Sequence, residues 1–265
     1  MSGTTATASP ESSAPLRYAP GVLTQWTIGM LVAHAVSAAM TVAVLTAAWN
    51  QPSRQAAMAF YGVYHRNPMN QLIHFFGVPA ILWTGFVFGA HLPWSPALMV
   101  PRVAPPLLPD IPKHYVTYAT VWCLFYTFYY IKIDPVGGLL YAPLLYGMYA
   151  SAVRWMLTDQ TNAKHEIDKP PPWTGTGKVL WWALLVHLLA WYVQIHPGHK
   201  MFEGAQPALL QSLGASFSSA PLFAFYEGVW FLGLRHTFRE QVRDLVQQYT
   251  IELCQGGSTM RACTV

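Results

Sequence analysis

The chain has 265 residues, of which 15 are lysine or arginine and 11 are aspartate or glutamate. Charged residues make up 10% of the sequence, whereas a typical soluble domain has about 25%. Hydrophobic residues make up 53% and occur in blocks separated by short polar stretches, a pattern typical of several membrane-spanning segments. This composition argues against a soluble enzyme. The three scattered cysteines argue against a disulfide scaffold or a zinc ribbon.

The net charge of +4 does not point to a nucleic-acid partner. The basic residues are spread singly from Arg17 to Arg261 and form no patch. We therefore expect membrane lipids, and no nucleic acid, among the partners.

The N-terminal part of the chain predicts a tail followed by an additional helix. Residues 1–20 are rich in Ser, Thr, Ala and Pro and predict a disordered tail. Within residues 21–50, the stretch from Val22 to Trp49 carries no formal charge. At about 1.5 Å per residue it is long enough to cross the hydrocarbon core, so it predicts a transmembrane helix. The polar stretch 51–70 is expected at the membrane interface, with a break at Pro68.

The middle of the chain holds three more apolar stretches. Residues 72–92, 114–133 and 136–157 each predict a helix that spans the membrane. A proline-rich loop over residues 93–113 separates the first two, because prolines at this density exclude a helix. Lys132 to Gly138 has the composition of a tight turn between two helices.

The C-terminal third begins with a polar loop at residues 158–178 and continues with an apolar stretch at 179–195. His196-Pro197-Gly198-His199 predicts a turn, because proline and glycine together end a helix. Two short stretches, 202–220 and 221–234, could span the membrane or re-enter it. Residues 235–253 predict an amphipathic helix on the membrane face.

These elements predict an all-α fold, a multi-span integral membrane helical bundle with five to six spanning or re-entrant helices plus interfacial helices. We expect the catalytic membrane domain in residues 51–237. The amphipathic C-terminal helix and tail would occupy residues 238–265.

Ionisable residues inside the apolar blocks are candidates for function. A buried ionisable side chain costs roughly 2.5 to 3.5 kcal/mol at the centre of a membrane helix unless something pairs with it. The residues in question are His74, His187 and Glu227, with His65, His199 and Glu203 at the edges of other blocks.

The first cluster joins two histidines across a helix break. On one continuous helix His65 and His74 would face opposite sides, but the Asn67-Pro68 pair interrupts the helix. Both imidazoles can then point at one spot. Asn67 and Asn70 could cap the second helix and orient an imidazole N–H, as a metal ligand requires.

The second cluster lies around His199. If a helix begins at Gly198 or His199, Glu203 shares the face of His199 and is either another ligand or a carboxylate that fixes the tautomer of a ligand. His65, His74 and His199 would then converge. Three imidazoles on one face of an octahedron suit iron(II) and leave positions for a chelating substrate and dioxygen. His187, His196 and Glu203 are candidates for a fourth ligand.

Less specific interpretations stay open. His74 could be a core histidine bonded to a backbone carbonyl, and His65 with His199 could contact lipid headgroups. The protein would then be a non-catalytic lipid-binding or scaffold protein of the membrane. A diiron hydroxylase or desaturase would need about twice as many clustered histidines. Glu227 could pair with a histidine or with Arg235.

Both clusters resemble a known family. The blocks His-x-Asn-Pro-x-Asn-x-x-x-His, at residues 65–74, and Gly-His-x-x-Phe-Glu, at residues 198–203, are similar to those of the fungal and bacterial membrane dioxygenases of 2-hydroxy fatty acids. The likeness covers roughly residues 58–235 and includes Pro207-Ala208-Leu209 and Ala220-Pro221 with Glu227. It differs at Arg66, where another histidine is common, and by one extra residue within residues 196–199.

The resemblance implies an endoplasmic reticulum membrane protein that uses ferrous iron (Fe2+) and dioxygen. Its substrate would be a 2-hydroxy long-chain fatty acid, shortened by one carbon with release of CO2 in the alpha-oxidation that follows phytosphingosine breakdown. The expected ligands are His65, His74 and His199, with His187 as a fourth. Glu203, Asn67, Asn70 and Arg66 would support catalysis. Arg66 or Lys200 would offset the carboxylate charge of the substrate, and the apolar helices 72–92 and 179–195 would hold its acyl chain.

Overall fold

The computed structural model describes residues 20–50, 53–92, 94, 116–163, 176–204 and 213–256. These residues are almost entirely helical and include no β-strand, so the all-α prediction is confirmed for this part of the chain. In chain order the helices are α1 (Pro20–Trp49), α2 (Arg54–Gly62), α3 (Pro68–Ala90), α4 (Tyr118–Ile133), α5 (Pro135–Ala163), α6 (Lys178–Val193), the π-helix η2 (Gln194–Glu203), α7 (Leu213–Phe231) and α8 (His236–Gln255).

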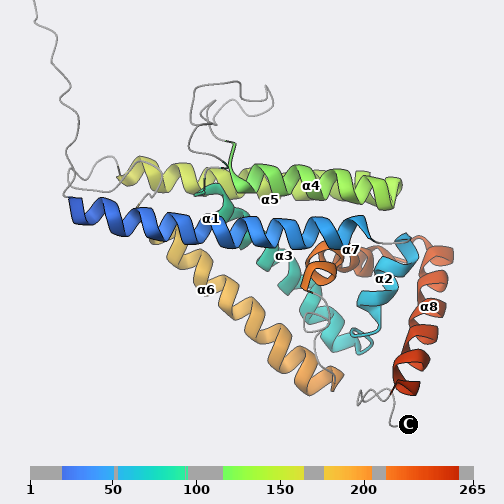
Figure 1. Cartoon of the computed structure of the whole chain (residues 1–265). Coiled ribbons are helices and arrows are strands. Elements are labelled where there is room, and N and C mark those ends of the chain that lie inside the picture. The colour runs from blue at the N-terminus through green and yellow to red at the C-terminus, as the bar shows by residue number, and fades with distance from the viewer. Residues whose placement is uncertain are drawn as a thin grey trace, which may run out of the picture.

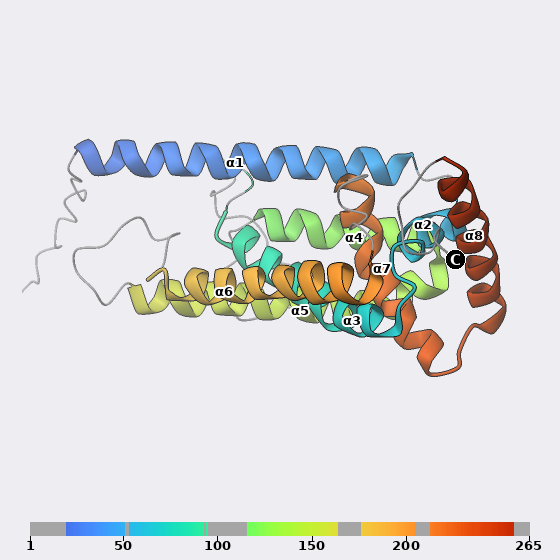
Figure 2. The ribbon, with the colours of Figure 1, turned by 90° about the horizontal axis from the view of Figure 1, so that it is seen from below.

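The long helices form a bundle, and α2, α7 and α8 lie at one of its ends (Figure 1 and Figure 2). Figures 1 and 2 both show α1, α4 and α5 lying along one direction, and Figure 1 shows α6 inclined to them; in Figure 2, α8 crosses the end of the bundle near α2 and α7. In Figure 1 the same end gathers α2, α7 and α8, which are far apart in the sequence. The expected tail before Pro20, most of the proline-rich loop 93–113, residues 164–175 and the chain after Gly256 lie outside the described residues.

Four of the described helices are long and apolar enough to cross a membrane: Leu31–Trp49, Pro68–Ala90, Pro135–Asp159 and α6 together with η2, Lys178–Glu203. The predicted five to six also counted the stretches that became α4 and α7. Helix α4 has 16 residues, which at about 1.5 Å per residue is shorter than a hydrocarbon core of about 30 Å. Helix α7 has 19 residues, but they include Ser216, Ser218 and Ser219. Residues of both helices belong to the hydrophobic core of the bundle.

The turn predicted at His196–His199 is wrong. The chain continues from α6 into the π-helix η2 without a break, and Pro197 lies inside it. A π-helix bonds residue i to i+5, so it takes up one residue more per turn than an α-helix. Pro221, where we expected a new segment to begin, also lies inside a helix, α7.

A buried carboxylate, that of Asp134, forms bonds to several elements at the end of the bundle where α2, α7 and α8 meet. Asp134 is 1% exposed and accepts hydrogen bonds from Arg235, Tyr226 and Arg54, the last at 3.3 Å. Asp134 is the single residue between α4 and α5, whereas Arg54 begins α2, Tyr226 lies in α7 and Arg235 precedes α8. Arg235 therefore binds Asp134, and its suggested pairing with Glu227 is wrong.

Candidate metal centre

His65 follows helix α2, and its ring is held by Tyr61, a residue of that helix. Its Nδ1 lies 2.8 Å from the carbonyl oxygen of Tyr61, to which it donates, and its ring stacks on the Tyr61 ring at 3.8 Å between centroids. The Nε2 atom is buried and has no hydrogen-bond partner among the described residues. The backbone carbonyl thus selects the tautomer that leaves the Nε2 lone pair free.

His74 lies in the second turn of α3 and repeats this arrangement. Asn67 is the N-cap of α3, where its side chain accepts a hydrogen bond from the Met69 N–H, and Pro68 opens the helix. The Nδ1 of His74 donates to the carbonyl oxygen of Asn70 at 2.9 Å. The predicted break at Asn67-Pro68 is therefore present and redirects the chain between the two histidines.

His199 comes from η2, which packs closely on α3. A Cβ at Gly198 would lie 2.6 Å from Oδ1 of Asn70 and 3.4 Å from Cε1 of His74, so glycine permits the approach. His199 is 3% exposed, and its Nδ1 is buried with no hydrogen-bond partner in the described part of the chain.

The three imidazoles converge as predicted. One ligand atom from each of His65, His74 and His199 lies within 4.8 Å of the others. Two ligands on one face of an octahedron, each about 2.1 Å from the ion, lie about 3 Å apart, so the three would close by up to about 2 Å around an ion. Buried polar atoms normally have a partner, and a cation would supply one to His65 Nε2 and His199 Nδ1. The residues present therefore fit a metal ion.

The electrostatic environment keeps the site ready for a cation. Burial lowers the pKa of His65 well below its usual range, and the neighbouring His74 and His199 lower it further. A neutral imidazole is the form that binds a metal.

Glu203 joins the two clusters through hydrogen bonds to the start of α3, and none of these bonds goes to an imidazole. Its Oε1 accepts from the Arg66 N–H and its Oε2 from the Asn67 N–H, each at 2.9 Å, and Oε2 also accepts from Asn70 Nδ2 at 3.0 Å. These donors lie at the N-terminus of α3, where the helix dipole favours a carboxylate. Glu203 thus ties the end of η2 to the start of α3.

The structure does not bring His187 to the other three histidines. Its Nδ1 lies 2.7 Å from Oγ1 of Thr84, and its Nε2 accepts from Trp191 Nε1 at 3.0 Å, so both ring nitrogens are engaged. Thr84 is ten residues beyond His74 on α3, about 15 Å along the helix. The side chains of Arg66 and Lys200 are exposed, and neither lines the cavity described below.

Glu227 is a second buried carboxylate near this end of the bundle. Both carboxylate oxygens are buried without a hydrogen-bond partner in the described ranges. Burial raises the pKa of Glu227 to about 9, and repulsion by Glu203 adds to the increase. The sequence identified Glu227 as an acid in an apolar block. Its lack of a partner could not be predicted, because this depends on how α7 packs.

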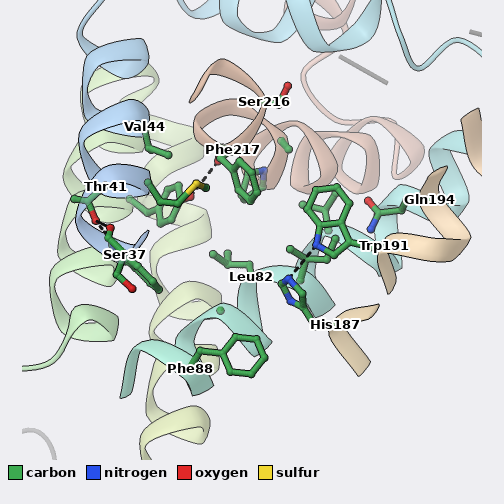
Figure 3. Close-up of a pocket in the computed structure, with 18 of the residues that line it drawn as sticks. Ser37, Thr41, Val44, Leu82, Phe88, His187, Trp191, Gln194, Ser216 and Phe217 are labelled. Atoms are coloured by element: carbon green, nitrogen blue, oxygen red, sulfur yellow. Dashed lines mark hydrogen bonds between the residues drawn. The ribbon is translucent and has the colours of Figure 1, made fainter. Parts of the chain in front are cut away.

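A cavity of about 540 Å3 extends from the three histidines along α3. Its lining is mostly apolar and includes Val78, Ile81, Leu82 and Phe88 of α3, together with Trp191 of α6 and Ile195 of η2. Figure 3 shows Ser37, Thr41 and Val44 of α1 on one side of the cavity and His187, Trp191 and Gln194 on another. The sequence predicted walls from α3 and α6 and missed those from α1, α4 and α7.

Fold and site together define a class: a helical protein with four helices long and apolar enough to cross a membrane, and with a candidate metal centre at one end of a long apolar cavity. A family model described as 2-hydroxy-palmitic acid dioxygenase Mpo1-like matches residues 51–107 and 109–229, and the chain belongs to this family. The resemblance drawn from the sequence is thereby confirmed.

A named relative supports the same assignment. The chain is 30% identical over 179 residues to 2-hydroxy-palmitic acid dioxygenase MPO1 of Saccharomyces cerevisiae, covering 68% of this chain and 81% of the yeast protein. No solved structure matches the chain significantly.

Proposed function

We propose that this protein is an iron(II)-dependent dioxygenase that shortens 2-hydroxy long-chain fatty acids by one carbon. The observation that carries the proposal is the group of three buried imidazoles at one end of an apolar cavity. The name of the yeast relative supports a 2-hydroxy acid as substrate.

The proposed reaction is balanced with dioxygen as the oxidant. One 2-hydroxy acid and one O2 yield the acid one carbon shorter, CO2 and water. The bond between C1 and C2 breaks, and C2 becomes the new carboxyl carbon. The four electrons removed from the substrate reduce one molecule of dioxygen.

Each residue of the site has a distinct task in this proposal. His65, His74 and His199 would hold the iron, which would supply the redox chemistry. Three protein ligands would leave positions for a chelating substrate and dioxygen. The carbonyls of Tyr61 and Asn70 orient two of the imidazoles. Asn67 caps α3, and Glu203 clamps η2 to α3 through Asn70 and the Arg66 N–H. Asn67, Asn70 and Glu203 are not among the residues that line the cavity, so they would hold the ligands in position without touching the substrate, whereas Tyr61 also lines the cavity.

The cavity explains why the site lies in a membrane protein. Its apolar walls would hold the acyl chain and exclude water, and the carboxyl end would lie at the histidines. From His74 to Phe88 the cavity follows fourteen residues of α3, about 21 Å. One lipid chain occupies about half of a hydrocarbon core that is about 30 Å thick. The cavity is longer than this half.

The test uses the purified protein in detergent with ferrous iron and 2-hydroxyhexadecanoate. We expect one iron per chain, oxygen uptake and formation of pentadecanoate, whereas hexadecanoate without the hydroxyl group should not react. An iron-loaded protein that consumes no oxygen and forms no odd-chain acid would contradict the proposal. Absence of iron, together with unchanged lipid binding in a folded His74→Ala variant, would instead favour the lipid-binding scaffold.

The proposal extends to location and pathway. The apolar helices support a multi-pass membrane protein. The family resemblance favours the endoplasmic reticulum and the 2-hydroxy acids that arise from phytosphingosine. Imaging of a tagged chain against an endoplasmic reticulum marker tests the location, and accumulation of 2-hydroxy acids after gene deletion tests the pathway.

A further inference from the structure

Helix α1 lies before the region that the family model matches, which begins at residue 51. It nevertheless supplies one wall of the cavity, with Ala33, Val36, Ser37, Met40, Thr41 and Val44 among the lining residues. A segment outside the matched region therefore shapes the space in which the proposed substrate would lie.

The wall is one face of α1. Ser37, Thr41 and Val44 are each 8% exposed, whereas Val32 and Val42 are 58% and 62% exposed. The inward residues recur every three or four positions, as expected for one helical face. Small side chains, Ala33 and Ser37, stand at the N-terminal end of this face.

Contacts with other helices fix the position of α1 along the cavity. Trp122 Nε1 donates to Thr41 Oγ1 at 2.8 Å, and Gly214 of α7 packs so closely that a Cβ there would lie 2.4 Å from the Ala43 carbonyl oxygen. These contacts set which turn of α1 faces which level of the cavity.

The direction of α1 relative to the candidate metal centre follows from its two ends. Its C-terminal end leads into α2, which is followed by His65. Near its N-terminal half, the His34 carbonyl oxygen accepts from the Tyr118 hydroxyl at 3.4 Å, and the Tyr118 N–H donates to Leu92, beyond the distal end of α3. Val44, Thr41, Ser37 and Ala33 thus lie at increasing distance from the histidines.

We propose that α1 sets the length of acyl chain that this protein accepts, and that Ser37 and Ala33 border the space for the chain's distal part. This inference rests on the proposed function, because it assigns the carboxyl end to the histidines. An extended chain of 1.52 Å bonds advances about 1.25 Å per carbon. The 21 Å or so between the levels of His74 and Phe88 then corresponds to about sixteen carbons.

The test replaces residues at two levels of the wall and one residue outside it. Ser37→Phe and Ala33→Phe fill the cavity at positions about 6 Å apart along α1, equivalent to about five carbons. Ala38→Phe places the same side chain on the exposed face of the same helix and is the matched control. Thermal unfolding and size-exclusion chromatography in detergent establish that each variant folds.

Oxygen uptake is measured with 2-hydroxy acids of eight to twenty carbons. We expect both wall variants to lose at least tenfold in kcat/KM for the longest chains while they retain short ones. The longest accepted chain should be several carbons shorter in Ser37→Phe than in Ala33→Phe, and unchanged in Ala38→Phe. Active variants whose chain-length profiles all match the wild type would overturn the inference.

A binding measurement separates this inference from the proposed function. Displacement of a fluorescent fatty acid by the same series of acids reports the chain-length profile without catalysis. If the wild type shows no oxidation but the wall variants shift the binding profile, the proposed function fails and the role of α1 stands. If neither profile shifts, the role of α1 fails whatever the activity.

Discussion

His65 and His74 reach the candidate metal centre through the same local hydrogen bond. Each donates its Nδ1–H to the carbonyl oxygen four residues earlier, that of Tyr61 and that of Asn70 respectively. The bond fixes the ring and directs the other nitrogen away from its own helix. Two imidazoles from different helices can therefore face a common point without a supporting carboxylate on either ring.

Loss of any of the three imidazoles should abolish metal binding. His65→Ala, His74→Ala and His199→Ala each remove one of three ligands, and we expect iron affinity to fall by at least about 100-fold. Iron content per chain is measured by mass spectrometry after dialysis against a weak chelator. His196→Ala is the matched control, because His196 lies three residues from His199 but stacks on Tyr192. Equal iron content in all four variants would contradict the assignment.

Glu227 should make stability depend on pH in a direction opposite to that of an ion-paired carboxylate. Burial raises its folded pKa to about 9, above the ordinary value of 4.5 for a glutamate. Between these values the folded state binds a proton that the unfolded state lacks, so stability falls as pH rises from about 5 to 9. Glu227→Gln removes this dependence. We expect the apparent Tm of iron-free wild type to fall by about 3 °C or more between pH 5 and pH 8.5, relative to the variant.

The control for this measurement is Glu240→Gln, which changes an exposed carboxylate of α8. Its Tm should follow the wild type across the pH range. If Glu227→Gln also follows the wild type, Glu227 is not neutral in the folded protein.

At the scale of elements, the site depends on how closely η2 approaches α3. Glu203 bonds across this contact, and Gly198 and Gly77 leave room for it, because a Cβ at Gly77 would lie 2.6 Å from the Gln194 side chain. The π-helical winding of η2 presents His199 toward α3 while Glu203 still reaches the α3 N-terminus. A π-helix within an α-helical protein frequently marks a functional site, which agrees with this position.

Gly198→Ala should weaken metal binding more than it alters the fold. The added Cβ would meet Oδ1 of Asn70 at 2.6 Å, so η2 must shift away from α3 and carry His199 with it. Overpacking of this kind costs about 1–3 kcal/mol of stability, and we expect a loss of iron affinity of at least about tenfold. Gly147→Ala in α5 is the control, since nothing lies within 4 Å of its Cβ. Titration with ferrous iron under nitrogen measures both variants.

Only part of the fold and of the candidate site could be predicted from the sequence. The Asn67-Pro68 break and the convergence of three histidines could be inferred because N-caps and prolines act locally. The π-helix could not, because proline and glycine together normally end a helix and the wider winding is rare. The wall made by α1 was also missed. An apolar segment with one face of small residues looks the same from its sequence whether that face meets lipid or a cavity.

At the scale of the whole molecule, the cavity extends along the bundle and the candidate metal centre lies at one end of it. Helices α1, α3, α4, α6 and α7 line the cavity, and α8 crosses near α2 and α7 at the end that carries the candidate metal centre. Phe231, the last residue of α7, is 90% exposed, and Leu232 and Leu234, between α7 and α8, are 72% and 55% exposed. Their exposure beside an amphipathic helix agrees with an end that contacts lipid.

Asp134 should control the integrity of this end more than that of the bundle. It binds Arg54 and Arg235 and accepts from Tyr226, so its loss leaves two arginines without their carboxylate. Breaking a buried ion pair costs about 3–5 kcal/mol; because both arginines are partly exposed, we expect about 2–3 kcal/mol for Asp134→Asn. Since the bonds join α2, α7 and α8, α8 should detach before the long helices unfold. Hydrogen exchange should therefore rise at least tenfold in α2 and α8 and remain unchanged in α5. The control is Asp244→Asn, which changes an exposed acid of α8 and should leave exchange in α2 and α8 at the wild-type rate. A uniform increase over all helices would show that Asp134 stabilises the whole bundle instead.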